Sequence, residues 1–243
     1  MNIIITGASS GIGYELFKIL RKKKENNFFL LSRNTKKINK NKKVKIYKID
    51  LKNKKKLTNI VKKIIVHSNK KIDLIICNAA EATFGPVDKI PIEHYEKNFD
   101  VNFFSHLILI KSILPLMKRE NKGHIVNISS GAGIFGFQNS SSYSIGKSSM
   151  QILIESLYHE CKAKNIHTKN IFPGLTNTNF YQRNIYLMKR KKDKLLMNKN
   201  IVAKKIASNL FKKKLNIFCQ NKTKISYLIK IMPNLEILKN KFS

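Results

Sequence analysis

Short apolar segments alternate along the chain with longer segments in which apolar positions recur every three or four residues. The short segments are typical of buried strands, and they predict strands at residues 2–6, 27–32, 44–49, 72–77, 124–129, 167–172 and 215–219. The longer segments predict helices at residues 11–24, 54–67, 92–105, 106–120, 143–164 and 201–213. The connection at 34–43 is short and rich in Lys and Asn, so no full helix is expected there. This alternation predicts an α/β fold, a doubly wound parallel sheet flanked by helices on both faces.

A glycine-rich loop, TGASSGIG at residues 6–13, joins the first predicted strand to the first predicted helix. Gly7 would allow the tight turn, Gly11 would let the backbone approach a pyrophosphate, and Gly13 would permit close packing of the helix. The free N–H groups and positive dipole end of the helix favour an anion there. The loop therefore predicts a dinucleotide site. The other loop residues expected to contact the cofactor are Ser9, Ser10 and Ile12.

The chain has 243 residues, 42% of them hydrophobic and 26% charged, which is typical of a globular protein with one substantial core. No internal repeat and no linker rich in Pro, Gly or Ser divides it, so residues 1–243 are predicted to form a single domain. The three cysteines form no C-x-x-C pair, which argues against a disulfide framework or a zinc site and fits a reducing compartment. With no signal peptide visible, we expect a cytoplasmic protein without a metal site.

The charge balance is unusual, because 48 Lys and Arg residues against 14 Asp and Glu residues give a formal net charge of +34. One interpretation is an anionic partner, either nucleic acid or an acidic membrane face. The excess is nearly all Lys, however, and it accompanies abundant Ile and Asn. These three residues share A/T-rich codons, so compositional drift would produce the same charge. Because Arg, which phosphate recognition usually enriches, is rare, we expect no specific nucleic-acid partner.

Tyr143 and Lys147 are four residues apart in a predicted helix, and Ser130 precedes Tyr143 by thirteen residues. Side chains four apart lie one turn from each other on the same helix face. A fixed ammonium beside a phenol favours the phenolate, so Lys147 is expected to lower the pKa of Tyr143. In a lysine-rich chain such a pair arises easily by chance, and the surrounding motifs decide what it means.

With these motifs in place, the sequence resembles the short-chain dehydrogenase/reductase family over nearly its whole length. The glycine loop matches the family's T-G-x-x-x-G-I-G motif, and the N-A-G motif appears as Asn78-Ala79-Ala80. Pro173-Gly174, followed by Thr178, resembles the P-G-x-x-x-T segment beside the nicotinamide. The catalytic tetrad of the family matches Asn102, Ser130, Tyr143 and Lys147. The resemblance implies a Rossmann-type fold and an NAD(P)-dependent oxidoreductase.

The resemblance also implies a role for each member of the tetrad. Tyr143 would be the general acid in carbonyl reduction and the general base in alcohol oxidation. Lys147 would lower the pKa of Tyr143 and hold the nicotinamide ribose hydroxyls. Ser130 would hydrogen-bond the substrate oxygen, where charge develops during hydride transfer. Asn102 would hold a water in a proton path to solvent.

The choice of cofactor rests on the end of the second predicted strand. An Asp or Glu there would bind the adenosine ribose hydroxyls and repel a 2′-phosphate, but the residues present are Ser32 and Arg33. Because Arg suits a phosphate, NADP(H) is favoured over NAD(H), although Arg33 could equally be a solvated side chain in a basic protein. Asp50, after the third strand, matches a family position that contacts the adenine.

Three residues near the expected site depart from the family pattern or stand out beside it. Ala80 replaces the glycine of the N-A-G motif, and Thr176 stands where an aliphatic residue is usual. We expect tighter packing at both positions without loss of cofactor binding. Glu81 should point near the mouth of the active site, where it would either contact substrate or be an exposed loop carboxylate.

The C-terminal third supplies the parts that are expected to recognise substrate. Residues 175–198 combine aromatic residues with a basic run, which suits a lid over an apolar or lipid-like substrate. The amphipathic extension at 222–243 would rest on an anionic membrane, on the domain or on a second subunit. In the resembled family the helices that match 103–117 and the helix after Tyr143 build dimer and tetramer interfaces, so the resemblance implies a homodimer or homotetramer. The alternatives to an enzyme are a catalytically silent dinucleotide-binding regulator and a basic nucleic-acid or membrane-surface binder.

Overall fold

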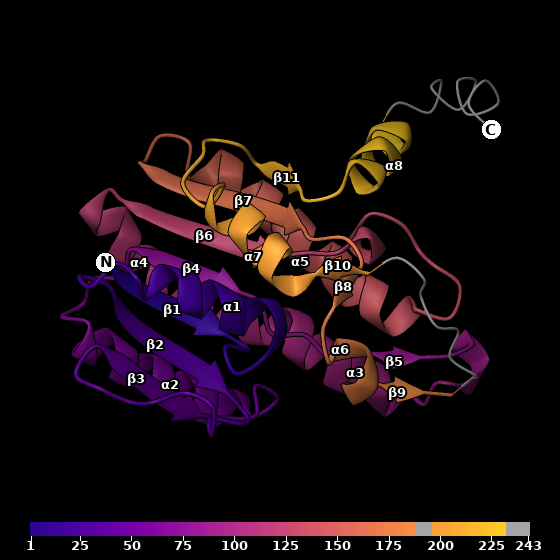
Figure 1. Ribbon diagram of the computed structural model, residues 1–243, viewed down its shortest axis with the longest axis horizontal. Helices are drawn as coiled ribbons and strands as arrows, with labels where there is room; N and C mark the ends of the chain where they lie inside the picture. The colour runs from indigo at the N-terminus through magenta and orange to yellow at the C-terminus, as the bar shows by residue number, and fades with distance from the viewer. Residues whose placement is uncertain (188–195, 232–243) are drawn as a thin grey trace.

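A parallel sheet of seven strands, in the order β11-β7-β6-β4-β1-β2-β3, forms the centre of the computed structural model, which describes residues 1–187 and 196–231 (Figure 1). Every predicted strand is present, within two residues at each end. The order reverses between β1 and β4, and ligands of open α/β sheets bind beyond the carboxyl ends of the strands at such a point. The strands are β1 (Asn2–Thr6), β2 (Asn27–Ser32), β3 (Val44–Lys48), β4 (Leu74–Cys77), β6 (Gly123–Ile128), β7 (Ile166–Phe172) and β11 (Asn216–Phe218).

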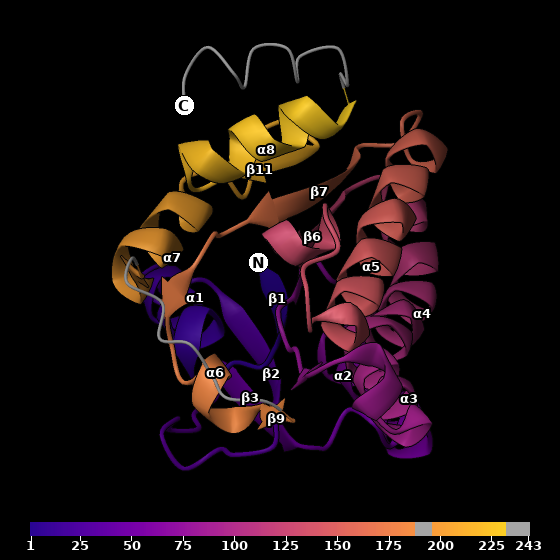
Figure 2. The ribbon, with the colours of Figure 1, turned by 90° about the vertical axis from the view of Figure 1, so that its right-hand side faces the viewer.

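Helices cover both faces of this sheet, as Figure 2 shows, which confirms the predicted fold class. On one face lie α1 (Gly11–Leu20) and α7 (Lys199–Ala207); on the other lie α2 (Lys54–His67), α4 (Ser105–Glu120) and α5 (Ser141–Glu160). Alternate residues of β1 serve the two cores: Ile3 and Ile5 pack toward α1 and α7, and Ile4 packs toward the other helices. Because both sides are buried, the strand is a continuous apolar run.

The helices predicted at 92–105 and 106–120 form one continuous helical stretch, because a π-helical turn connects them. The stretch consists of α3 (Ile92–Phe99), the π turn at Asp100–Phe104 and then α4. As expected, no helix forms between β2 and β3, where the chain makes turns and a bridge between Asn41 and Val44. The predicted first helix is shorter than expected and ends at Leu20.

Several short elements were not predicted, because two- to four-residue segments are too short to show a period. β5 (Thr83–Phe84) pairs with β9 (Ile185–Tyr186), and β8 (Thr176–Asn177) pairs with β10 (Met197–Asn198). The other short elements are α6 (Phe180–Arg183) and 3₁₀ turns at Val87–Lys89 and Gly131–Gly133, while the longer α8 (Asn221–Ile231) lies at the start of the predicted amphipathic extension. Residues 188–195 of the predicted lid and 232–243 of the predicted extension lie outside the described residues.

Within the described ranges, the helical stretch Ile92–Glu120 is long and apolar enough to cross a membrane by length and composition alone. Its side chains Leu109, Ile110 and Ile113 belong to the core, however, together with residues of α2 and the sheet. This part of the stretch therefore packs as a core helix.

Candidate active site

The glycine loop leaves the end of β1 and turns sharply before α1. Gly7 and Gly11 have positive φ angles of +67° and +55°, a conformation that residues with a side chain rarely adopt. A Cβ on Gly7 would also lie 2.9 Å from Nδ2 of Asn78. A Cβ on Gly13 would lie 2.6 Å from the Gly7 carbonyl oxygen, so glycine at position 13 lets the first turn of α1 approach the backbone of Gly7. Such a cradle, bare of side chains at the start of α1, fits a pyrophosphate.

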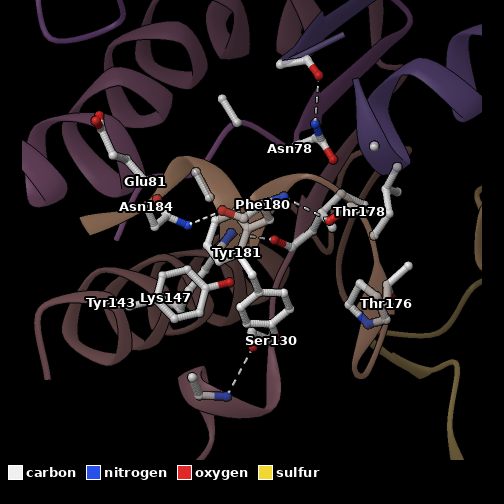
Figure 3. A pocket seen from close by; sticks show the side chains of 18 of the residues that line it. Asn78, Glu81, Ser130, Tyr143, Lys147, Thr176, Thr178, Phe180, Tyr181 and Asn184 are labelled. Atoms are coloured by element: carbon white, nitrogen blue, oxygen red, sulfur yellow. Dashed lines mark hydrogen bonds between the residues drawn. The ribbon is translucent and has the colours of Figure 1, made fainter. Parts of the chain in front are cut away.

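Asn78 holds this loop from the neighbouring strand. Its Nδ2 donates to the carbonyl oxygens of Thr6 and Gly7, at 3.0 and 3.2 Å, as part of the network around the labelled Asn78 in Figure 3. The Thr6 hydroxyl accepts the backbone N–H groups of Asn78 and Ala79, at 2.9 and 3.0 Å. β1 and β4 are therefore tied together where the sheet order reverses.

His106 extends this network toward the catalytic asparagine predicted by the resemblance. Its Nε2 lies 3.0 Å from the Thr6 hydroxyl, and its Nδ1 lies 3.3 Å from the backbone carbonyl of Asn102. Burial, and then the charge of Lys147, lower the pKa of His106 to about 3. The ring is therefore neutral, with Nδ1 donating to Asn102 and Nε2 accepting from Thr6.

Asn102 lies in the π turn and is fully buried. Its Nδ2 donates to the Glu81 carbonyl oxygen at 2.7 Å, and its Oδ1 accepts the Glu81 N–H at 2.9 Å. A Cβ on Gly146 would lie 2.8 Å from Cβ of Asn102, so Gly146 lets α5 approach the π turn. Glycine at a helical position, flanked by the predicted Tyr143 and Lys147, was the signal by which this contact could have been foreseen.

Ser130, Tyr143 and Lys147 gather on one side of a cavity, with Phe180 and Tyr181 beside them (Figure 3). Ser130 is at the end of β6, and its hydroxyl accepts the Ala132 N–H at 3.2 Å. Nζ of Lys147 donates to the Ile128 carbonyl oxygen at 2.7 Å and lies 5.8 Å from the centre of the Tyr143 ring.

The pKa of Tyr143 differs from the expectation. Burial raises it, and a hydrogen bond with Ser130 opposes this shift only in part. Lys147 was predicted to lower this pKa, but its ammonium is directed to the Ile128 carbonyl, and burial dominates. Burial also lowers the pKa of Lys147 to about 8, so Lys147 is mostly charged at neutral pH.

The cavity has a volume of about 970 Å³ and runs from the glycine loop to Tyr143. Of the predicted site residues, only Gly13 and Asn102 lie behind its wall rather than on it. The predicted residues that line it are Gly7, Ser9, Ser10, Gly11, Ile12, Arg33, Asp50, Asn78, Ala79, Ser130, Tyr143, Lys147, Pro173, Gly174 and Thr178. Ala80 lines it too, while the hydroxyl of the buried Thr176 donates to the Gly174 carbonyl at 3.1 Å.

Aromatic rings surround Tyr143 at the other end of the cavity. The ring centres of Phe84 and Phe180 lie 6.2 and 5.3 Å from that of Tyr143, and Tyr186 stacks on Phe84 at 5.0 Å. These rings come from the β5–β9 pair and α6. The described part of the predicted lid therefore borders the cavity next to the tyrosine.

Besides the backbone pairing of β9 with β5, two side-chain hydrogen bonds attach the described part of this lid segment to the rest of the molecule. Oδ1 of Asn184 accepts the Ala82 N–H at 2.8 Å beside the β5–β9 pair. Nη1 of Arg183 donates to the Ser10 hydroxyl at 2.8 Å, which places a guanidinium at the start of α1. Arg183 did not stand out in the sequence, because only folding brings residue 183 to residue 10.

The adenosine end of the cavity contains a group of charges. Nη1 of Arg33 lies 3.6 Å from Oε1 of Glu81, and Nζ of Lys52 lies 3.5 Å from Oε2 of Glu81 and 3.8 Å from Asp50. In Figure 3 the Glu81 side chain points away from Tyr143. Glu81 lines the cavity and is only partly exposed, so the expected exposed loop carboxylate is corrected: the carboxylate pairs with two cations.

Across residues 1–187 and 196–231, no group of three His, Cys, Asp or Glu side chains is arranged to hold a metal ion. The row of Ser130, Tyr143 and Lys147, the glycine cradle and the rings of Phe84 and Phe180 all line one cavity.

Comparison with known proteins assigns the family. A family model described as short chain dehydrogenase matches residues 1–186. The chain is also similar to the 3-ketodihydrosphingosine reductase of Dictyostelium discoideum, with 29% identity over 206 residues, or 75% of this chain and 62% of the relative.

Two solved structures show the same fold. A short chain dehydrogenase from Burkholderia cenocepacia J2315, in complex with NADP, superposes with a TM-score of 0.79 and 18% identity, covering 100% of this chain and 97% of that one. A 4-hydroxyisoleucine dehydrogenase complexed with NADH and succinate gives a TM-score of 0.73 and 22% identity, covering 89% and 96%. The chain belongs to the short-chain dehydrogenase family and is an oxidoreductase of CH–OH groups with NAD(P) as acceptor.

Proposed function

We propose that the protein interconverts a carbonyl and an alcohol by hydride transfer with NADP(H), and that Tyr143 is the general acid and base. The observation that carries this proposal is the single cavity lined by both the glycine cradle and the row of Ser130, Tyr143 and Lys147. A dinucleotide-binding regulator without catalysis would have no need of that row, and a nucleic-acid binder would have no need of the cradle.

Different residues of the cavity would bind different parts of the cofactor. Gly7, Gly11 and the N–H groups at the start of α1 would hold the pyrophosphate, and Asp50 would lie beside the adenine. Lys147 would hold the nicotinamide ribose hydroxyls, and Thr178 lies against Gly11 on the opposite wall, where a Cβ on Gly11 would come within 3.3 Å of it. When bound, the nicotinamide supplies or accepts the hydride.

The proton steps belong to the polar row. In reduction, the Tyr143 hydroxyl gives its proton to the substrate oxygen, and the raised pKa keeps that proton in place until the reaction. The Ser130 hydroxyl stabilises the negative charge that develops on the same oxygen. The Lys147 ammonium holds a positive charge 5.8 Å from the centre of the Tyr143 ring, and Asn102 positions the surrounding backbone through Glu81.

Phe84 and Phe180, which line the cavity beside Tyr143, favour an apolar or lipid-like substrate, because their rings offer no hydrogen bond to a polar one. A relative named for reduction of a long-chain keto compound agrees with this proposal. Arg33 at the end of β2 supports NADP(H) over NAD(H).

We further propose a cytoplasmic homodimer or homotetramer. The free, buried cysteines fit a reducing compartment. Large apolar side chains are exposed on α5, with Ile145 at 49% and Ile152 at 60%, and a second subunit would cover them. The basic C-terminal segment would then be free for peripheral contact with an anionic membrane.

A substrate screen tests the proposed activity. The purified protein would be mixed with NADPH or NADH and a panel of ketones, aldehydes and 3-ketoacyl compounds of increasing chain length, and loss of the reduced cofactor would be followed by absorbance. We expect faster turnover with NADPH and rising kcat/KM with chain length. Turnover of none of the panel with either cofactor, in a protein that binds both, would argue for the regulator instead.

A further inference from the structure

The carboxylate of Glu81 crosses the end of the cavity where the adenosine ribose is expected. It lies between two cations: Oε1 is 3.6 Å from Arg33, and Oε2 is 3.5 Å from Lys52. Both distances are longer than a charge-assisted hydrogen bond, which is usually about 2.7–2.9 Å. The carboxylate is thus shared between Arg33 and Lys52 rather than fixed to either.

The backbone of Glu81 is held much more firmly than its carboxylate. The Asn102 amide binds both the N–H and the carbonyl of residue 81, at 2.9 and 2.7 Å. Of the side chain, 22% is exposed, and Oε2 is buried with no hydrogen-bond partner among the described residues. The carboxylate therefore has two ion-pair partners but no short hydrogen bond that fixes it to either.

The position of this carboxylate matters because β2 ends without one. In dinucleotide sites an acidic residue after β2 binds the ribose 2′-hydroxyl, and an arginine binds the 2′-phosphate. Here Arg33 follows β2, and the acidic residue reaches the same place from the loop after β4. A 2′-phosphate would have to replace Glu81 as the ion-pair partner of Arg33, and it would then lie beside the negative charge of Glu81. A 2′-hydroxyl could instead donate a hydrogen bond to Glu81.

We propose that Glu81 sets the discrimination between NADP(H) and NAD(H), by competing with the 2′-phosphate for Arg33 and by accepting the 2′-hydroxyl. This inference rests on the proposed function. When the 2′-phosphate pairs with Arg33, the Glu81 carboxylate would pair with Lys52 alone. Loss of Lys52 would leave Glu81 on Arg33 alone and so would act in the opposite direction.

The test is a comparison of binding rather than of activity. Dissociation constants for NADPH and NADH would be measured by calorimetry for the wild type, Glu81→Gln and Lys52→Gln. Glu81→Gln keeps the shape of the side chain and leaves the backbone bonds to Asn102 in place. We expect it to raise the preference for NADPH over NADH by about fivefold, the effect of one partly exposed charge pair. Lys52→Gln should lower the same preference.

A matched control separates this local effect from the change in net charge. Glu93→Gln removes one negative charge from an exposed position of α3 and should leave the preference unchanged. Equal preference in wild type and Glu81→Gln, with both dinucleotides bound, would overturn this inference alone. A wild type that binds neither dinucleotide would overturn the proposed function together with it.

Discussion

Gly146 and Asn102 pack so closely that a Cβ on the glycine would lie 2.8 Å from Cβ of the asparagine. This contact joins α5, which carries Tyr143 and Lys147, to the π turn that carries Asn102. Because Asn102 in turn binds the backbone of Glu81, one glycine sets the spacing between the catalytic helix and the adenosine end of the cavity.

Gly146→Ala should therefore damage the site. In an open helix this change would stabilise the protein by up to about 1 kcal/mol through helix propensity, but here the methyl group must displace Asn102. We expect a lower melting temperature and a kcat/KM reduced about tenfold or more. Gly136→Ala is the matched control, because a Cβ on Gly136 meets nothing within 4 Å. Equal effects of the two variants would contradict this account of Gly146.

Tyr143→Phe should abolish turnover while NADPH still binds. The phenyl ring keeps the contacts with Phe84 and Phe180, so the cavity retains its wall, and only the proton donor is lost. General acid–base groups usually contribute about 10²–10⁴-fold, and we expect a loss in kcat of that size. Tyr158→Phe, at an exposed position of the same helix, is the control. A Tyr143→Phe enzyme with near-normal kcat would refute the assigned role.

Arg183→Gln should weaken the binding of NADPH and the binding of NADH by a similar factor. Nη1 of Arg183 lies 2.8 Å from the Ser10 hydroxyl, so its charge lies at the start of α1, where the pyrophosphate common to both cofactors is expected. We expect about a fivefold rise in both dissociation constants. Arg119→Gln, whose guanidinium pairs with the exposed Glu120 on α4, should change neither. A rise confined to NADPH would instead place Arg183 beside the 2′-phosphate.

Acid should destabilise the fold through its buried histidines. Burial lowers the pKa of His106 to about 3 and that of His124 to about 4, from an ordinary value of 6.5. Below pH 6.5 these histidines are therefore protonated in the unfolded chain but stay neutral in the folded chain. The free energy of unfolding falls as the pH drops toward 4. For a fully buried group such as His106 the limiting slope is about 1.4 kcal/mol per pH unit.

Melting temperatures between pH 7.5 and 4.5 measure this slope. His106→Gln should make the curve less steep, even if its hydrogen bonds are lost and the protein melts earlier at every pH. The exposed His159→Gln on α5 should leave the slope unchanged. A slope that stays the same in His106→Gln would show that this ring does not titrate as its burial requires.

The sheet and the row of Ser130, Tyr143 and Lys147 could be predicted because each produces a local pattern in the sequence. Strands buried on both faces are unbroken apolar runs, and Tyr143 and Lys147 are four residues apart on one helix turn. The tertiary contacts of Arg183 with Ser10 and of Glu81 with Arg33 leave no such pattern, since they join residues 173 and 48 positions apart. The lowering of the Tyr143 pKa was wrong for a related reason, because burial is a property of the whole fold.

The π turn at Asp100–Phe104 makes this enzyme sensitive to residue number as well as residue identity. Each residue of an α-helix turns the chain by about 100°, and a π turn accommodates one residue more than an α turn. Deleting a single residue there would leave an ordinary α turn between α3 and α4, so the sheet and both helices would be spared, but Asn102 would shift by one position and move away from Glu81. A change of length within this turn would therefore abolish the proposed activity even in a chain that keeps Asn102, Ser130, Tyr143 and Lys147.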